Sequence, residues 1–422
     1  MLEEFKNKKV LILGFGKEGM NNFRFLRRLF PKKVLGIADK KPLSHLFCDR
    51  KKYSIGVRWH LGEDYFKALK NYDIVIKSPG IPFKIMPRNV LGRVTSQTEI
   101  FFENCPGKIV GITGTKGKST TAALIYKILK EGGIKAHLVG NIGKPVLSLL
   151  FRAKPSDVYI YELSSHQLYN LKKSPQIAVF LNIFSEHLDY YRNFKEYVRA
   201  KANIACYQTK NDYLIYNSGD KLVREIAKQS KAIKIPIKGE YYKLNKTAAK
   251  TVGKIFKIPK EKIAKAIKNF KPLPYRLELV GTFKRITFYN DALSTIPETA
   301  ILAMEALGKR VQTVFLGGFD RKIDFKKLAK YILKNKNIKN LILFPTTGEK
   351  ICKEIIKLSQ NKKVPRHFFV NNMPEGVRLA YQYTQKGKIA LLSCASTSFS
   401  IFRDYKEKGN LFKKYVKKYA KR

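Results

Sequence analysis

Apolar runs of strand length alternate with amphipathic helical stretches from one end of the chain to the other. The first such run, VLIL at residues 10–13, leads into the helical stretch NNFRFLRRLF at residues 21–30. Later runs are rich in Val, Ile and Leu, and they read DIVIK, KIVGIT, VYIY, IAVFL, TVFLGG, NLILF and KIALL. Continuous apolar strands followed by helices are typical of parallel sheets that are covered on both faces. The pattern therefore predicts an α/β protein.

Points where the strand–helix series starts again mark the expected domain boundaries. One restart follows Pro106, just before the run KIVGIT, and a second follows Pro297, where a helix precedes the run TVFLGG. The chain has 422 residues, and domains typically contain about 100–200 residues. We therefore predict three α/β domains, at residues 1–104, 105–297 and 298–422.

Composition favours a globular protein of the cytoplasm. Hydrophobic residues make up 44% and charged residues 27% of the chain, which are ordinary proportions. The longest uncharged apolar stretch, at residues 174–185, is shorter than the roughly 20 residues of a membrane helix, and no signal peptide is recognisable. The five cysteines lie far apart without a C-x-x-C motif, so neither a disulfide framework nor a zinc ribbon is indicated. We expect a cytoplasmic protein without a membrane partner.

The charge balance is unusual. Lys and Arg number 84 against 32 Asp and Glu, which gives a net charge of +52. Such a charge favours anionic ligands and is compatible with nucleic acid. However, the excess is spread along the chain, and its densest stretch, at residues 403–422, has apolar residues at helical spacing, as in a solvated terminal helix. Charge alone does not indicate a nucleic-acid partner, and we expect none.

The strongest chemical signal is the sequence IVGITGTKGKSTTAALIYKILKEGG, at residues 109–133. Here an apolar strand runs into a glycine loop that opens a helix, so that backbone N–H groups can face a phosphate. Lys118 would reach the β- and γ-phosphates, and a hydroxyl group next to it would hold Mg²⁺. Position 112 is Ile, so the strict P-loop spacing is not met. The predicted ATP-binding residues of this loop are Gly114, Thr115, Lys116, Gly117, Lys118, Ser119 and Thr120.

A weaker signal lies near the N-terminus. Gly14, Gly16 and Gly19 follow the strand VLIL, and Asp39 ends the next strand twenty residues after Gly19. This spacing matches a dinucleotide-binding fingerprint, whose acidic residue contacts a ribose hydroxyl. Taken alone, it would suggest an NAD-dependent oxidoreductase, and a tight turn without a ligand would give the same spacing. An ATP loop in the next domain makes hydride transfer a poor account of the whole chain.

Polar residues follow two predicted strands of the central domain. Glu162 and Ser164 come after VYIY, and His187 comes after IAVFL. The C-terminal ends of parallel strands form the usual ligand edge of a sheet. A carboxylate at Glu162 is suited to Mg²⁺, and His187 offers an imidazole donor, whereas His166 is more simply explained as a structural residue.

Four motifs in this order and spacing resemble those of the Mur ligases, the ATP-dependent amide-forming enzymes of peptidoglycan synthesis. They are GTKGKST at 114–120, GNIG at 140–143, ELSS at 162–165 and NIFSEHLD at 182–189. The resemblance covers essentially the whole chain. Through residues 9–19, SPGI at 78–81, SCASTS at 393–398 and KGN at 408–410, it is strongest to members that join D-glutamate to UDP-N-acetylmuramoyl-L-alanine. It implies an N-terminal Rossmann-like domain, a central P-loop ATPase-like parallel sheet and a C-terminal Rossmann-like domain, in a protein that we expect to be a monomer.

The resemblance also implies roles for individual residues. Lys201, fourteen residues after His187, matches the lysine that the family carbamylates, and a carbamate would place an anion near a second Mg²⁺. The implied catalytic residues are Lys118, Glu162, His187 and Lys201. The implied ligands of two Mg²⁺ ions are Ser119, Thr120, Glu162, His187 and carbamylated Lys201.

Further implied contacts concern the substrates. The UDP-substrate residues of the N-terminal domain are Gly14, Gly16, Lys17, Glu18, Gly19, Asp39, Ser78, Pro79 and Gly80. Asn141 and Ser164 would approach the muramoyl-peptide end of that substrate. Asn290 and Asp320 would contact adenine and ribose, and Ser398 and Tyr405 would lie near the D-glutamate carboxylates. The family's Asn-Asp-Ser-Lys-Ala-Thr segment reads NDALST at 290–295, so the polar pair after Asp291 is missing.

Two alternatives remain open. Another Mur-type ligase or a folylpolyglutamate synthase would share the ATP motifs, although the latter would not need the glycine-rich N-terminal domain. A basic nucleic-acid-binding ATPase would use the phosphate loop and the charge, but it gives no reason for Glu162, His187 and Lys201 at their spacings.

Overall fold

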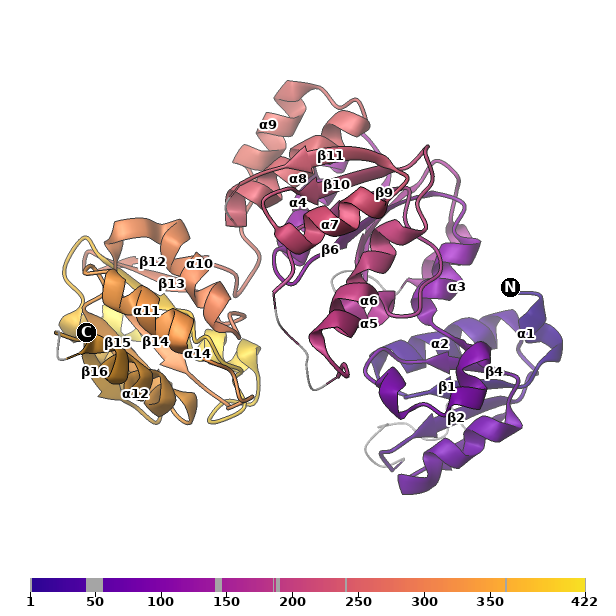
Figure 1. Cartoon of the computed structure of the whole chain (residues 1–422), viewed down its shortest axis with the longest axis horizontal. Coiled ribbons are helices and arrows are strands. Elements are labelled where there is room, and N and C mark those ends of the chain that lie inside the picture. The colour runs from indigo at the N-terminus through magenta and orange to yellow at the C-terminus, as the bar shows by residue number, and fades with distance from the viewer. Residues whose placement is uncertain are drawn as a thin grey trace. The chain divides into compact units, whose positions relative to one another are not determined.

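The computed structural model describes residues 2–42, 56–140, 146–184, 186, 190–239, 241–360 and 363–421. These residues form three β-sheets with helices packed against them, which confirms the predicted α/β class (Figure 1). The chain divides into two compact units, Met1–Phe270 and Lys271–Arg422. The first unit contains two of the sheets.

The N-terminal sheet has five parallel strands in the order β3-β2-β1-β4-β5. They are β1 (Val10–Leu13), β2 (Leu35–Asp39), β3 (Val57–Leu61), β4 (Ile74–Lys77) and β5 (Val94–Thr95). The accompanying helices are α1 (Glu4–Asn7), α2 (Lys17–Leu29) and α3 (Gln97–Asn104), with 3₁₀ turns η3 (Glu63–Asn71), η4 (Phe83–Ile85) and η5 (Arg88–Arg93). This strand order is that of nucleotide-binding Rossmann folds, in which ligands bind where the order reverses beside β1.

The second sheet has six parallel strands in the order β11-β10-β9-β6-β8-β7. They are β6 (Lys108–Thr113), β7 (Ala136–Gly140), β8 (Val158–Glu162), β9 (Ile177–Phe180), β10 (Tyr213–Asn217) and β11 (Ile233–Ile237). The helices are α4 (Lys118–Glu131), α5 (Ser165–Leu168), α6 (Phe194–Cys206), α7 (Lys221–Gln229), α8 (Tyr241–Ile255) and α9 (Lys260–Lys268), with η6 (Leu147–Arg152). Because β6 lies between β8 and β9, the loops that follow these three strands meet at one edge of the sheet.

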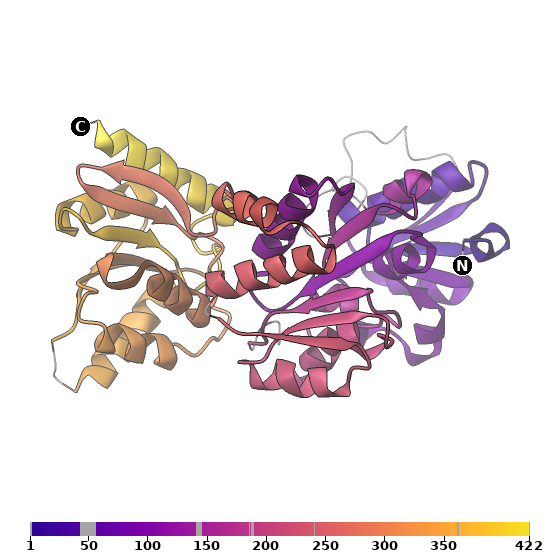
Figure 2. The same ribbon diagram turned by 90° about the horizontal axis from the view of Figure 1, so that it is seen from above.

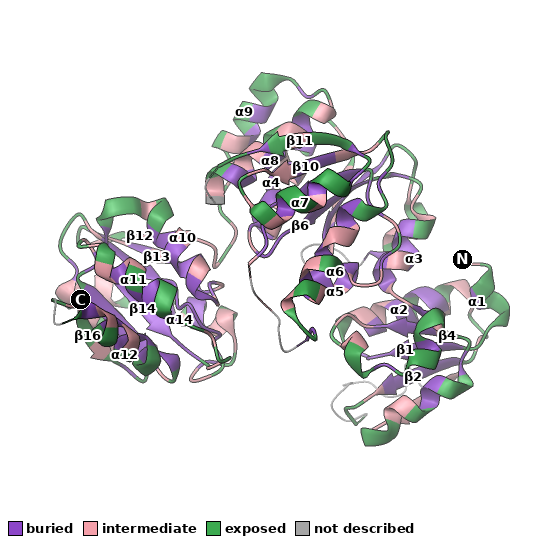
Figure 3. Ribbon diagram, viewed as in Figure 1, coloured by how far each residue is buried: buried purple, intermediate pink, exposed green. Residues whose placement is uncertain are grey.

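The second sheet is buried on both faces, as its continuous apolar strands predict. On β6, Val110 and Ile112 pack with apolar residues of α4, α8 and α9, whereas Ile109 packs on the opposite face. That opposite face also joins the N-terminal sheet, since Phe101 of α3 meets Tyr159 of β8 with ring centroids 5.2 Å apart. The two sheets of the first unit therefore share a hydrophobic core, and burial is concentrated in the strands (Figure 3).

The third sheet makes up the second unit, and its strand order is β12-β13-β17-β14-β15-β16. Its strands are β12 (Glu278–Phe283), β13 (Ile286–Asn290), β14 (Val311–Gly317), β15 (Asn340–Phe344), β16 (Arg366–Phe369) and β17 (Ile389–Leu392). Its helices are α10 (Pro297–Leu307), α11 (Lys326–Lys334), α12 (Thr347–Ser359), α13 (Met373–Tyr383) and α14 (Tyr405–Ala420), with η7 (Gly308–Arg310). Figure 2 shows the yellow helix α14 alongside the strands of this sheet, and its contacts include β12 and β13.

The start of the third sheet differs from the boundary that we expected at residue 297. The antiparallel strands β12 and β13 precede that residue, and β13 pairs with β17 from Thr287 to Asn290. Pro297 is the first residue of α10, where its fixed φ angle suits a helix start, so it marks a helix and not a domain boundary. The boundary between the compact units lies earlier, after Phe270.

Two further observations concern the described part of the chain. No helix there is both long and apolar enough to cross a membrane. The four cysteines that it includes, Cys105, Cys206, Cys352 and Cys394, are all free thiols.

Candidate functional site

A phosphate loop joins β6 to α4, at the position that the sequence predicts. Gly117 precedes the helix with a positive φ angle of 89°, and a Cβ atom there would lie 2.5 Å from Oδ1 of Asn245. Only glycine fits this conformation and this space without strain. Ser119 and Thr120 are buried in the first turn of α4, where free backbone N–H groups favour an anion.

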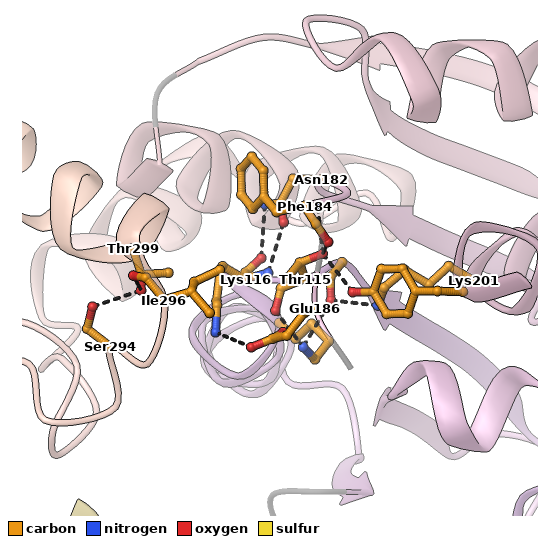
Figure 4. A network of polar contacts seen from close by, with 12 residues as sticks. Thr115, Lys116, Asn182, Phe184, Glu186, Lys201, Ser294, Ile296 and Thr299 are labelled. Atoms are coloured by element: carbon orange, nitrogen blue, oxygen red, sulfur yellow. Dashed lines mark hydrogen bonds and ion pairs between the residues drawn. The ribbon is translucent and has the colours of Figure 1, made fainter. Parts of the chain in front are cut away.

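The end of β9 holds the loop in shape. The Lys116 backbone N–H donates to Oδ1 of Asn182 at 2.8 Å, and Nδ2 of Asn182 donates back to the Lys116 carbonyl at 3.0 Å (Figure 4). The hydroxyl of Thr115 lies 2.8 Å from that of Tyr197 on α6 and accepts a hydrogen bond from the Phe184 N–H at 2.9 Å. These hydrogen bonds, all within the protein, fix the shape of the loop.

Three lysine side chains gather around this loop. Nζ of Lys118 donates to the carbonyls of Gly114 and Thr115 at 2.9 and 3.0 Å, and Nζ of Lys201 donates to Gly114 at 3.0 Å. Lys116 forms an ion pair of 2.9 Å with Glu186. Lys201 is 2% exposed, and burial, followed by the nearby Lys118 cation, lowers the pKa of its amine well below the ordinary value. This site combines positive charge with low exposure to water, as a polyphosphate site requires.

Glu162 lies beside the loop at the end of β8. It pairs in register with Ile112, two residues before Gly114, and its carboxylate is buried. Its Oε2 atom has no hydrogen-bond partner among the described residues. Together with the hydroxyls of Ser119 and Thr120, this carboxylate fits the hard oxygen ligands that Mg²⁺ prefers. Within the described residues, no cluster of three His, Cys, Asp or Glu side chains forms a separate metal centre.

Three other residues were expected in the central site, and the structure does not place any of them at the phosphate loop by a described contact. His187 and Asn141 lie outside the described residues. Ser164 caps the short helix α5, because its Oγ accepts from the Gln167 N–H at 3.3 Å. This capping places Ser164 on the loop that follows Glu162.

The N-terminal glycine loop is also preformed. Gly14 has a φ angle of 85°, and a Cβ atom at Gly19 would lie 2.0 Å from the Gly14 carbonyl oxygen, so both positions require glycine. Oγ of Ser78 donates to the same carbonyl at 2.7 Å, and Asp39 accepts from the Phe15 N–H at 2.6 Å. Gly16, Lys17 and Gly80 are exposed around this loop. The loop after β4 therefore packs directly on the glycine loop.

The 78–81 turn is held by two further side chains. The ammonium of Lys77 donates to the carbonyls of Ser78 and Ile81 at 3.0 and 2.7 Å. From the second sheet, the Tyr190 hydroxyl lies 2.9 Å from the carbonyls of Pro79 and Ile81. The turn that carries the predicted substrate residues is thus bonded to the loop that follows β9.

Glu18 makes a second link between the two sheets of the first unit. Its carboxylate accepts from Nε2 of Gln167 at 3.2 Å, and Lys77 lies close enough to lower its pKa, although burial raises the pKa overall. Glu18, Lys77 and Gln167 line a small pocket with His166 and residues of α3. Glu18 therefore lies at the junction of the two sheets.

The remaining predicted residues lie in the second unit. Asn290 is fully buried and donates to Glu278 at 3.1 Å, so its amide holds the sheet together. Asp320 follows β14, and its contact with Lys350 lowers the pKa of its carboxyl. Ser398 is buried, and its Oγ has no partner among the described residues. Tyr405 begins α14, with its ring 5.6 Å from that of Tyr275.

Comparison with known proteins identifies the family. The model of the Mur ligase middle domain matches residues 112–285. The UDP-N-acetylmuramoylalanine--D-glutamate ligase of Acetivibrio thermocellus is 32% identical, and the alignment covers 98% of this chain and 97% of that protein. The chain belongs to the Mur ligase family. This membership confirms the resemblance and the expectation of a ligase.

Solved Mur ligase structures share the fold. MurF of Acinetobacter baumannii aligns with a TM-score of 0.62 at 14% identity, covering 96% of this chain and 90% of that one. MurF of Thermotoga maritima, solved in complex with ADP, aligns with a TM-score of 0.59 at 16% identity, covering 99% and 98%.

Sequence patterns missed several side chains of this Mur ligase site. Asn182, Glu186 and Tyr197 contact the phosphate loop from 66, 70 and 82 residues away along the chain, respectively. The motif NIFSEHLD contains the first two, but its spacing does not reveal their partners. Lys77 carried no sequence signal except its place beside Ser78 at the end of an apolar strand.

Proposed function

We propose that this Mur ligase joins D-glutamate to UDP-N-acetylmuramoyl-L-alanine at the expense of ATP. The observation that carries the proposal is the phosphate loop beside the buried carboxylate of Glu162, whose Oε2 atom has no hydrogen-bond partner among the described residues. The choice of substrates is supported by the name of the Acetivibrio relative, which aligns over nearly the full length of both chains. We place the enzyme in the cytoplasm, because its substrates are small soluble anions, and we propose that it acts as a monomer.

The proposed reaction has two steps. The alanyl carboxylate attacks the γ-phosphorus of ATP, so that an acyl phosphate forms and ADP leaves. The amine of D-glutamate then attacks the acyl carbon, the amide bond forms and inorganic phosphate leaves with the loss of a proton from nitrogen. The protein's contribution is positioning and charge neutralisation, by Lys118 and by the N–H groups at the start of α4.

Mg²⁺ would bind to the oxygen atoms of Glu162, Ser119 and Thr120, and it would neutralise phosphate charge. Lys201 is proposed to act as a carbamate next to a second Mg²⁺ with His187. Carbamate formation requires neutral amine, and the lowered pKa of the buried Lys201 supplies that form. The adenine and D-glutamate contacts proposed for Asn290, Asp320, Ser398 and Tyr405 all belong to the second unit.

The N-terminal glycine loop is proposed to bind the uridine nucleotide and not NAD. In a dinucleotide site the acidic residue after the second strand is available to a ribose, whereas Asp39 already binds the N–H groups of Phe15 and Lys41. Titration of the full chain with the UDP substrate and with NADH tests this assignment. Binding of NADH without binding of the UDP substrate would reject it.

Phosphate release with exchanged amino acids tests the proposed reaction. With ATP, Mg²⁺ and UDP-N-acetylmuramoyl-L-alanine present, we expect phosphate release with D-Glu and none with L-Glu, L-Ala or L-Lys. Release with another amino acid would assign the chain to a different Mur-type reaction. Release with a folate substrate in place of the UDP substrate would favour a folylpolyglutamate synthase.

A further inference from the structure

Lys116 and Glu186 form an ion pair at the mouth of the phosphate loop that the reaction above does not use. Nζ of Lys116 lies 2.9 Å from Oε1 of Glu186, and the side chains are 14% and 15% exposed (Figure 4). Glu186 belongs to the segment after β9, whereas Lys116 is the third residue of the loop after β6. The pair is therefore a contact between the two strand ends that frame the phosphate site.

The backbone of Lys116 is held by hydrogen bonds, whereas its side-chain ammonium is held, among the described residues, by the Glu186 carboxylate alone and can rotate to another anion. Both backbone polar groups of Lys116 are bonded to the Asn182 side chain, at 2.8 and 3.0 Å. A change of partner therefore needs only side-chain rotation and leaves the loop intact. The other two lysines near the loop differ, because Lys118 and Lys201 bind backbone carbonyls of the loop itself.

We propose that Lys116 exchanges the Glu186 carboxylate for a nucleotide phosphate when nucleotide binds, so that Glu186 sets the affinity of the loop. The proposal rests on the function proposed above. Without nucleotide, the Glu186 carboxylate neutralises the Lys116 ammonium, which lies close to Lys118 at the same loop. When phosphates enter, they compete with Glu186 for the same cation, and the apparent affinity falls by the fraction of time that Lys116 is paired.

ADP binding in the presence of EDTA tests the exchange without chemistry and without metal. We measure dissociation constants by calorimetry for the full chain, for Glu186→Gln, for Lys116→Met and for the double variant. If Lys116 is paired about 90% of the time, Glu186→Gln tightens ADP binding by up to about tenfold. Lys116→Met weakens binding by about tenfold, because one charge-assisted phosphate contact is lost.

The double variant shows whether Glu186 affects ADP affinity through its ion pair with Lys116. In the Lys116→Met background, Glu186→Gln should leave ADP affinity unchanged, since the competition no longer exists. A persisting tightening would mean that Glu186 acts as a general negative charge, and it would overturn the exchange. Glu103→Gln is the matched control, because it removes a carboxylate from another ion pair of the same unit, with Lys173, and should change nothing.

The remaining outcomes are also decisive. If Lys116→Met does not fold, Lys116→Gln replaces it in the same cycle. Glu186→Gln that binds ADP with unchanged or weaker affinity overturns the exchange and leaves the proposed function standing. If the unmodified chain does not bind ADP in EDTA, the exchange fails. If it binds ADP neither in EDTA nor with Mg²⁺, the proposed function fails as well.

Discussion

Lys118 is the residue on which phosphoryl transfer depends most directly. Its ammonium is bonded to the Gly114 and Thr115 carbonyls, so it is already at the phosphate loop. We expect Lys118→Ala to lower turnover by ~10²–10³, because one preorganised charge on the transferring phosphoryl group is lost. Phosphate-release kinetics measure the effect, and circular dichroism checks that the fold is kept. If Lys118→Ala turned over as fast as the unmodified protein, Lys118 and its loop would not take part in the reaction.

Lys201 is one of three buried lysines in the described part of the chain, and it is the one whose amine lies at the phosphate loop. We expect Lys201→Ala to be nearly inactive, since neither an ammonium nor a carbamate remains beside Gly114. A small added carboxylic acid should restore part of the activity by supplying the missing anion. Lys195→Ala is the matched control, because Lys195 is exposed on the same helix, α6, and its loss should have no effect. Full activity of Lys201→Ala would make Lys201 a structural residue.

These individual residues were predictable to different degrees. Loop residues such as Gly117 and Lys118 are recognisable because their chemistry depends on local spacing within one strand–loop–helix segment. Contacts from distant segments are not encoded in spacing, so the bonds of Asn182 and Tyr197 to the loop emerged only from the fold. Burial of Lys201 likewise depends on how α6 packs against the second sheet.

Among the elements, strands with continuous apolar runs were predicted correctly, and the β12–β13 pair was not. Strand β8 is buried along its whole length, as the run VYIY predicts. In contrast, β12 is the edge strand of a mixed sheet and has no fully buried residue, and its neighbour β13 alternates buried and partly exposed residues. The sequence TFKRITFYN therefore did not stand out, and the boundary expected at residue 297 lies after both of these strands.

Lys77, the last residue of β4, leads to a testable prediction about how the free energy of unfolding depends on pH. Burial lowers the pKa of Lys77 from 10.5 to about 7, although Glu18 opposes the shift. Between these two values the unfolded chain binds a proton that the folded chain lacks, so stability rises with pH. Relative to Lys77→Met, the unmodified protein should gain about 2 kcal/mol of unfolding free energy between pH 7 and pH 9.

Urea unfolding of both proteins at several pH values measures this difference. The exposed Lys70, in the turn η3 that precedes β4, provides the control variant Lys70→Met, which should follow the unmodified protein at each pH. A constant difference between Lys77→Met and the unmodified protein across this range would mean that Lys77 stays charged when buried. In that case its bonds to the Ser78 and Ile81 carbonyls would outweigh the cost of burial.

For the molecule as a whole, the net charge of +52 is the feature that the proposed reaction needs least. The lysines that are buried in the described part of the chain are Lys77, Lys201 and Lys408. The other described lysines are at least partly exposed, and they occur in both compact units. Such a surface attracts anionic substrates over a distance set by salt, without forming a specific contact with them.

The charge therefore predicts a dependence on ionic strength and not on nucleic acid. The KM for the UDP substrate should rise as salt is increased, because screening shortens the reach of the surface charges to about 10 Å at 0.1 M. Added DNA or RNA should not accelerate phosphate release, whereas omission of D-glutamate should abolish it. Nucleic-acid-stimulated ATP hydrolysis that falls steeply with salt and ignores D-glutamate would contradict the ligase assignment. Such a result would still be consistent with ATP binding at the phosphate loop, but it would mean that the positive surface binds nucleic acid.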